Sequence, residues 1–136
     1  MTASKVLQLI EISSDPIARN QPELLDDSRL KKELKGLLSK KNGFYTFESS
    51  LHVFPSGGTT HVTLERWNSA DLWRADYGDL ANGLFFFAED AFGGQFAISD
   101  DGIYSFDPET GKRDRIAPDV EGWVDCILVD FNYLTG

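Results

Sequence analysis

The 136-residue chain is long enough for one domain with a sizeable core, and its composition, 41% hydrophobic and 26% charged, is that of a globular protein. Its net charge of −9 argues against nucleic acid as a partner, because the phosphates would be repelled. No apolar stretch approaches the roughly 18 residues that cross a bilayer, and the single cysteine excludes an internal disulfide. We therefore expect a cytoplasmic protein that binds neither nucleic acid nor membranes.

The N-terminal 43 residues predict two helices and no signal peptide, because a sustained apolar core and a cleavage site are missing. The first helix covers residues 4–12 and ends before Pro16. The second begins after Ser28 as N-cap and ends at Asn42 and Gly43. One face of this second helix is apolar, formed by Leu30, Leu34, Leu37 and Leu38.

The middle of the chain predicts short elements. Residues 44–47 and 51–54 have the pattern of extended segments. Residues 62–64 fit either a strand or the lead into the next element. A short helix over residues 70–77, with Ser69 as its cap, follows.

An apolar run at residues 84–88 predicts the central strand. It holds three consecutive phenylalanines, which is too apolar for a strand with one solvated face, so we expect both faces to be covered. Two further strands are predicted at 96–98 and 103–106, joined by a turn at 100–102, and residues 115–117 add a last short strand.

The C-terminal segment predicts a helix with Asp119 as N-cap. Its apolar stripe consists of Val120, Trp123, Val124, Ile127, Leu128 and Phe131. Consecutive hairpin strands between terminal helices indicate a single α+β domain over residues 1–136, with a mostly antiparallel central sheet flanked by N- and C-terminal helices.

Charge and aromatic residues divide the sequence near Phe44. Residues 1–43 carry 8 Lys/Arg and 6 Asp/Glu, whereas residues 44–136 carry 5 and 16, and all 17 aromatic residues lie at or after Phe44. The acidic body fits a basic protein partner as well as a merely soluble surface.

Residues with catalytic potential are sparse. His61 and Glu65 lack a third metal ligand, and residues 57–60 resemble a phosphate-binding loop but lack the following lysine. Cys126 lies beside an apolar stripe, as structural cysteines do. We expect no catalytic residue, no metal and no cofactor.

Aromatic residues interleaved with carboxylates are the better candidates, because such surfaces suit recognition of a basic protein. An alternative is that the aromatic residues are core and the aspartates support turns. The candidate partner-binding residues are Trp67, Asp71, Trp73, Asp76, Asp79, Glu89, Asp90, Asp100, Asp101 and Asp107.

Several motifs in fixed order carry a family resemblance. They lie at residues 41–44, 51–55, 65–68, 73–77, 86–96 and 103–111, at Trp123, and at residues 132–136. On these residues the chain resembles the SUKH superfamily, the group typified by the yeast Smi/Knr cell-wall regulator and by many bacterial immunity proteins. The resemblance covers residues 28–136. Similar proteins commonly continue into a further helix, so it implies either a short member or a truncated one.

The resemblance implies an α+β fold, no enzymatic activity and, as the common bacterial role, neutralisation of a toxin by direct binding. A basic toxin domain, often a nuclease, would then be the partner of the acidic body. The eukaryotic members imply the alternative of a regulatory or scaffold protein with an endogenous partner. The oligomeric state stays open.

Overall fold

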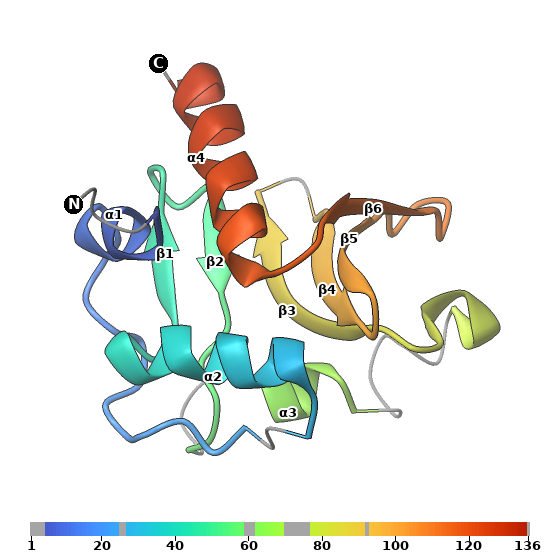
Figure 1. Cartoon of the computed structure of the whole chain (residues 1–136), viewed down its shortest axis with the longest axis horizontal. Helices are drawn as coiled ribbons and strands as arrows, with labels where there is room; N and C mark the ends of the chain where they lie inside the picture. The colour runs from blue at the N-terminus through green and yellow to red at the C-terminus, as the bar shows by residue number, and fades with distance from the viewer. Residues whose placement is uncertain (1–4, 25–26, 59–61, 70–76, 92, 136) are drawn as a thin grey trace.

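The computed structural model describes residues 5–24, 27–58, 62–69, 77–91 and 93–135, with side chains described as far as Val129. This part of the chain is α+β, as the sequence predicts: an antiparallel six-stranded sheet with helices from both ends of the chain packed on it (Figure 1). The strands lie in the sheet in chain order, so each is paired with the next one along the sequence.

The strands are β1 (Phe44–Thr46), β2 (Leu51–Val53), β3 (Phe85–Asp90), β4 (Gln95–Ser99), β5 (Gly102–Phe106) and β6 (Arg113–Ala117). The helices are α1 (Lys5–Glu11), α2 (Arg29–Lys40), α3 (Leu64–Trp67), the 3-10 helix η2 (Gly78–Ala81) and α4 (Val120–Thr135). Among the described helices, none has the length and apolar character needed to span a membrane.

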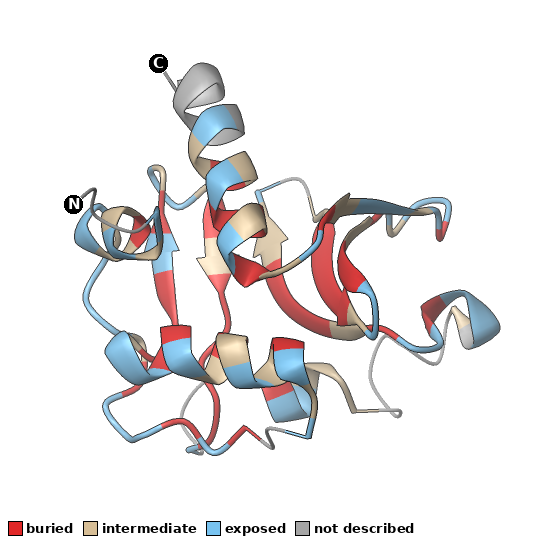
Figure 2. Ribbon diagram, in the orientation of Figure 1, coloured by how far each residue is buried: buried red, intermediate tan, exposed pale blue. Residues whose placement is uncertain are grey.

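One face of the sheet carries the main core, where α1, α2 and α4 pack (Figures 1 and 2). Helix α2 buries the four leucines of its predicted apolar face, and Ser28 caps it by accepting the Lys31 N–H at 3.3 Å. The predicted stripe of α4 is buried at Trp123 and Ile127 and half-buried at Leu128. The helical periodicity therefore predicted this face correctly as far as Leu128, and the side chain of Phe131 lies outside the described ones.

Trp123 lies at the centre of this core. It is fully buried, and its ring meets Phe87 edge-on at 4.8 Å and Phe96 at 5.6 Å between centroids. Its indole N–H has no hydrogen-bond partner among the described residues. The side chain is thus held by packing alone.

Strand β3 extends two residues past its predicted end. Glu89 and Asp90 continue the strand because they pair with His52 and Leu51 of β2. Phe86 and Phe87 alternate into clusters on the two sides of the sheet, and a bulge at Phe87 then keeps Ala88 on the same side as Phe87. Both faces of the phenylalanine run are therefore covered, as the sequence predicts.

The second cluster lies on the face opposite the long helices and is small. It consists of Ala81, Leu84, Phe86, Ala97 and Phe106. Tyr77 packs edge-on against the Phe106 ring at 5.2 Å, and its hydroxyl donates to the Pro108 carbonyl at 2.6 Å. We call this side of the sheet the far face.

Residues 62–64 lead into a helix rather than forming a strand. The hydroxyl of Thr63 accepts the Arg66 N–H at 3.2 Å, which caps α3. Just after α3, the amide of Asn68 bonds both the N–H and the carbonyl of Phe86, each at 2.7 Å. These two hydrogen bonds to β3 hold Trp67, the last residue of α3, over the far face.

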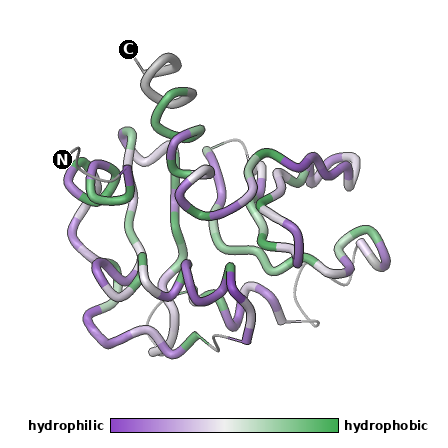
Figure 3. Tube along the Cα trace, viewed as in Figure 1, coloured by the Kyte–Doolittle hydropathy of each residue, from purple (hydrophilic) through white to green (hydrophobic). Residues whose placement is uncertain are grey.

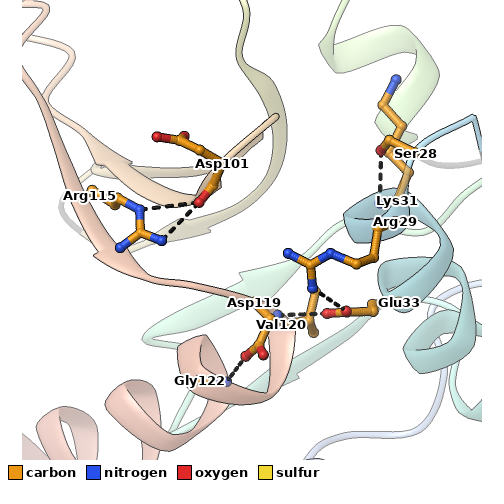
Figure 4. A network of polar contacts seen from close by, with 9 residues as sticks. All are labelled: Ser28, Arg29, Lys31, Glu33, Asp101, Arg115, Asp119, Val120 and Gly122. Carbon is orange, nitrogen blue, oxygen red and sulfur yellow. Dashed lines mark hydrogen bonds and ion pairs between the residues drawn. The ribbon is translucent and has the colours of Figure 1, made fainter.

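The start of α4 is joined to α2 by a carboxylate (Figure 4). Glu33 accepts the Val120 N–H at 3.0 Å with one oxygen and pairs with Arg29 at 3.0 Å with the other. Asp119 accepts the Gly122 N–H at 2.7 Å and is the predicted cap of α4. Two carboxylates therefore satisfy N–H groups that a helix start leaves unpaired.

Candidate functional site

A line of directly opposed residues crosses four strands on the far face. Tyr45 of β1 pairs with His52 of β2, His52 with Glu89 of β3, and Glu89 with Gln95 of β4. Residues directly opposite one another share a face and lie within contact distance. We call Tyr45, His52, Glu89 and Gln95 the cross-strand row.

Side-chain contacts link the row to α3. Nδ1 of His52 lies 3.2 Å from Oε1 of Glu89, and since an ionised carboxylate only accepts, the imidazole donates this bond. Gln95 Nε2 lies 3.5 Å from the other Glu89 oxygen and donates to the Gly93 carbonyl at 3.1 Å. Trp67 Nε1 donates to Gln95 Oε1 at 2.9 Å. The polar series therefore runs from β2 to α3.

Glu89 is the charged centre of the row. The hydrogen bond from His52 is the main cause that holds the pKa of Glu89 below its usual range, while partial burial opposes it. The His52 charge and the Gln95 amide lower the pKa further. Glu89 therefore carries its negative charge at neutral pH, with about a third of its side chain exposed at 31%.

The buried amide of Gln95 holds the row in place. It is only 5% exposed, and a buried amide is costly unless its donors and acceptor are paired. Trp67 supplies a donor, and Glu89 with Gly93 supplies acceptors. The sequence analysis did not single out Gln95, although a glutamine beside three apolar residues was a visible signal.

The structure joins two of the predicted binding residues and adds two others. Trp67 and Glu89 meet through Gln95. The two others are His52 and Tyr45, which were not among the predicted binding residues. Tyr45 is 41% exposed and stacks on His52, with 4.4 Å between ring centroids.

Two predicted aspartates lie beside the row at one end of the sheet. Asp90 and Asp107, together with Glu109, line a groove of about 290 Å³ that also includes Gln95. Asp90 accepts the Gly94 N–H and Asp107 the Glu109 N–H, each at 2.9 Å, so both also support turns. We call this groove, with its three carboxylates, the acidic groove.

The other predicted acids lie elsewhere. Asp100 and Asp101 occupy the turn at the opposite end of β4, about 15 Å away by the rise of a five-residue strand. Asp101 accepts the Tyr104 hydroxyl at 3.0 Å, and Asp79 is exposed on η2, where it accepts from Asn82. The acidic candidates are therefore distributed over separate regions. The predicted helix at 70–77 falls outside the described residues, except for Tyr77. The same holds for three of the candidates, Asp71, Trp73 and Asp76.

The residues considered for other chemistry have structural partners. Glu65 accepts hydrogen bonds from the Ser56 hydroxyl at 2.9 Å and from the Gly57 N–H at 2.7 Å. Gly57 belongs to the loop that resembles a phosphate site, so one backbone N–H of that loop is already paired with a carboxylate. Cys126 Sγ lies 3.7 Å from the Ile116 carbonyl. Within the described ranges, no three His, Cys, Asp or Glu side chains converge as a metal site would require.

In comparisons with known proteins, no family model, no curated protein and no solved structure matches the chain.

Proposed function

We propose that the chain is a non-catalytic protein-binding domain of the immunity type, which neutralises a basic toxin domain by direct contact. The observation that carries this proposal is the acidic groove beside the cross-strand row. Asp107 and Glu109 are exposed there, and neither forms an ion pair with a lysine or arginine of the described residues. Their charge is available to a partner.

Charge distribution supports a basic partner. Residues 44–136 carry 16 acids against 5 bases, and two of those bases, Arg113 and Arg115, donate to backbone carbonyls. Figure 3 shows the turn before β6 and that strand as hydrophilic, and the acids and bases of residues 107–117 balance, so the excess of acids comes from the rest of residues 44–136. A negative field of this kind accelerates encounter with a basic surface and repels acidic ones.

The row supports binding more than catalysis. Its polar groups are bonded to one another, which gives a rigid surface with an exposed aromatic ring at one end. Rigid aromatic residues are enriched at protein interfaces. The resemblance to the SUKH superfamily on residues 28–136 adds the immunity role to this general expectation.

The test is co-expression with the C-terminal domain of a secreted protein encoded beside this gene. We expect the chain to restore growth of cells that produce the toxin domain and to form a complex with it. The association rate should fall as salt rises, because exposed charges are screened within about 10 Å at 0.1 M salt.

Two charge reversals at opposite ends of the sheet form a matched pair. Glu109→Lys, in the acidic groove, should slow association at least about threefold at low salt. Asp100→Lys, on an exposed turn at the other end of β4, should change the rate little. A rate that ignores salt, with full protection by Glu109→Lys, would overturn the proposal.

A regulatory or scaffold role predicts a different outcome. The chain would then fail to protect against any neighbouring toxin domain and would form a stoichiometric complex with a cellular protein instead. The same Glu109→Lys and Asp100→Lys pair would show whether that complex also uses the acidic groove.

A further inference from the structure

Aromatic rings form a continuous series beside Glu89. Tyr45 and His52 are stacked at 4.4 Å with planes 16° apart, and His52 meets Phe54 edge-on at 4.6 Å. Phe54 in turn contacts Trp67 at 5.3 Å. Phe54 is buried and Trp67 half-buried, so Tyr45 is the outermost ring and the one most open to a partner.

The Glu89 carboxylate next to these rings can accept further hydrogen bonds. Glu89 accepts from His52 with Oε1, and among the described residues its Oε2 has only the long contact with Gln95 at 3.5 Å. A carboxylate can accept about four hydrogen bonds. His52 is the one ion-pair partner of Glu89 that the described residues provide, so the carboxylate still attracts a cation.

Building on the proposed function, we infer that Tyr45, His52 and Glu89 bind an arginine side chain of the protein partner. A guanidinium forms paired hydrogen bonds with a carboxylate and also lies favourably against aromatic rings. Tyr45 and Glu89 are two strand spacings apart, about 10 Å, which an extended arginine spans with its stem on the rings. Lysine offers a point charge without the planar fork and is the poorer fit.

The test uses the whole chain and a capped Gly-Arg-Gly tripeptide, followed by NMR. We expect the peptide to shift the signals of Tyr45, His52 and Glu89 at neutral pH.

Matched peptides and variants separate recognition from general charge attraction. Gly-Lys-Gly should bind at least about threefold more weakly than Gly-Arg-Gly, and the uncharged citrulline analogue should not bind. Glu89→Gln should abolish the response and Tyr45→Ala should weaken it, whereas Asp100→Asn, at the other end of β4, should leave it unchanged. The spectrum of each variant reports whether it is folded.

Equal binding of the lysine and arginine peptides would overturn the inference, and so would binding that survives Glu89→Gln. These results require no toxin domain. If the peptide does not bind, the Glu109→Lys test of the acidic groove still decides the proposed function. If the Glu109→Lys test fails instead, a positive peptide response still supports the arginine site.

Discussion

The two faces of the sheet are stabilised by different interactions. On the helix-covered face, Trp123 is fully buried and meets phenylalanine rings, and its indole has no hydrogen bond to any described residue. On the far face, Trp67 is half-buried and its indole donates to Gln95, which in turn meets Glu89. One tryptophan fills space and the other orients a polar series. The helix-covered face supports the fold, and the far face presents a charged, ordered surface.

The largest expected effect is on the helix-covered face. Trp123→Ala should lower the free energy of unfolding by about 3–5 kcal/mol, because it leaves a cavity among packed rings. Tyr45→Ala on the far face should change it by less than about 0.5 kcal/mol, since the ring is largely at the surface. Urea unfolding of both variants tests the contrast, and equal losses would erase it.

A smaller effect should follow when the polar series is interrupted. Trp67→Phe removes the donor to Gln95 and leaves a buried acceptor unpaired, which should cost about 1–3 kcal/mol. In a double-mutant cycle, Gln95→Met should cost less when Trp67 is already phenylalanine than in the native chain. Additive costs would show that the two side chains act independently.

The junction between helices should contribute about 1 kcal/mol. Glu33→Ala removes the acceptor for the Val120 N–H at the start of α4, and the loss should resemble that of a helix cap. Glu33→Gln retains an acceptor and should recover most of the loss. Thermal unfolding measures both, and an unchanged midpoint for Glu33→Ala would remove this contact from the account of the fold.

A further effect, similar in size to that of the helix junction, depends on pH. Because the pKa of Glu89 is lower in the folded than in the unfolded chain, its ionised form contributes stability above the unfolded value of about 4.3. That contribution is lost as pH falls through the folded pKa. Glu89→Gln should therefore be less stable than the native chain near pH 6, by about 1 kcal/mol, and equally stable at about pH 2. A pH-independent difference in urea titrations would contradict this sign.

The difference between the two faces of the sheet also explains which structural features can be predicted from the sequence. Helix α2, helix α4 and strands β3 to β5 follow from local apolar spacing and from turns near Gly93 and Gly102. The row does not follow, because its residues are brought together by strand register. A slip of one residue in β3, or the absence of its bulge at Phe87, would move Glu89 to the other face.

Two parts of the site depend on partners distant in sequence. Glu89 and Asp90 pair with β2, more than 35 residues earlier in the chain, and Glu89 also pairs with Gln95 of β4. Trp67 reaches Gln95 because Asn68 bonds the backbone of Phe86. Local patterns contain neither fact. The acidic candidates were chosen by residue type, and the sheet then divided them between its two ends.

The most direct test of the account is a map of amide chemical shifts over the whole chain as the Gly-Arg-Gly peptide is added at neutral pH. The account predicts the largest changes at Tyr45, His52 and Glu89, and little change around Trp123 on the helix-covered face. Changes centred on that face, or spread evenly over every acidic turn including Asp100 and Asp101, would contradict the assignment of binding to the far face.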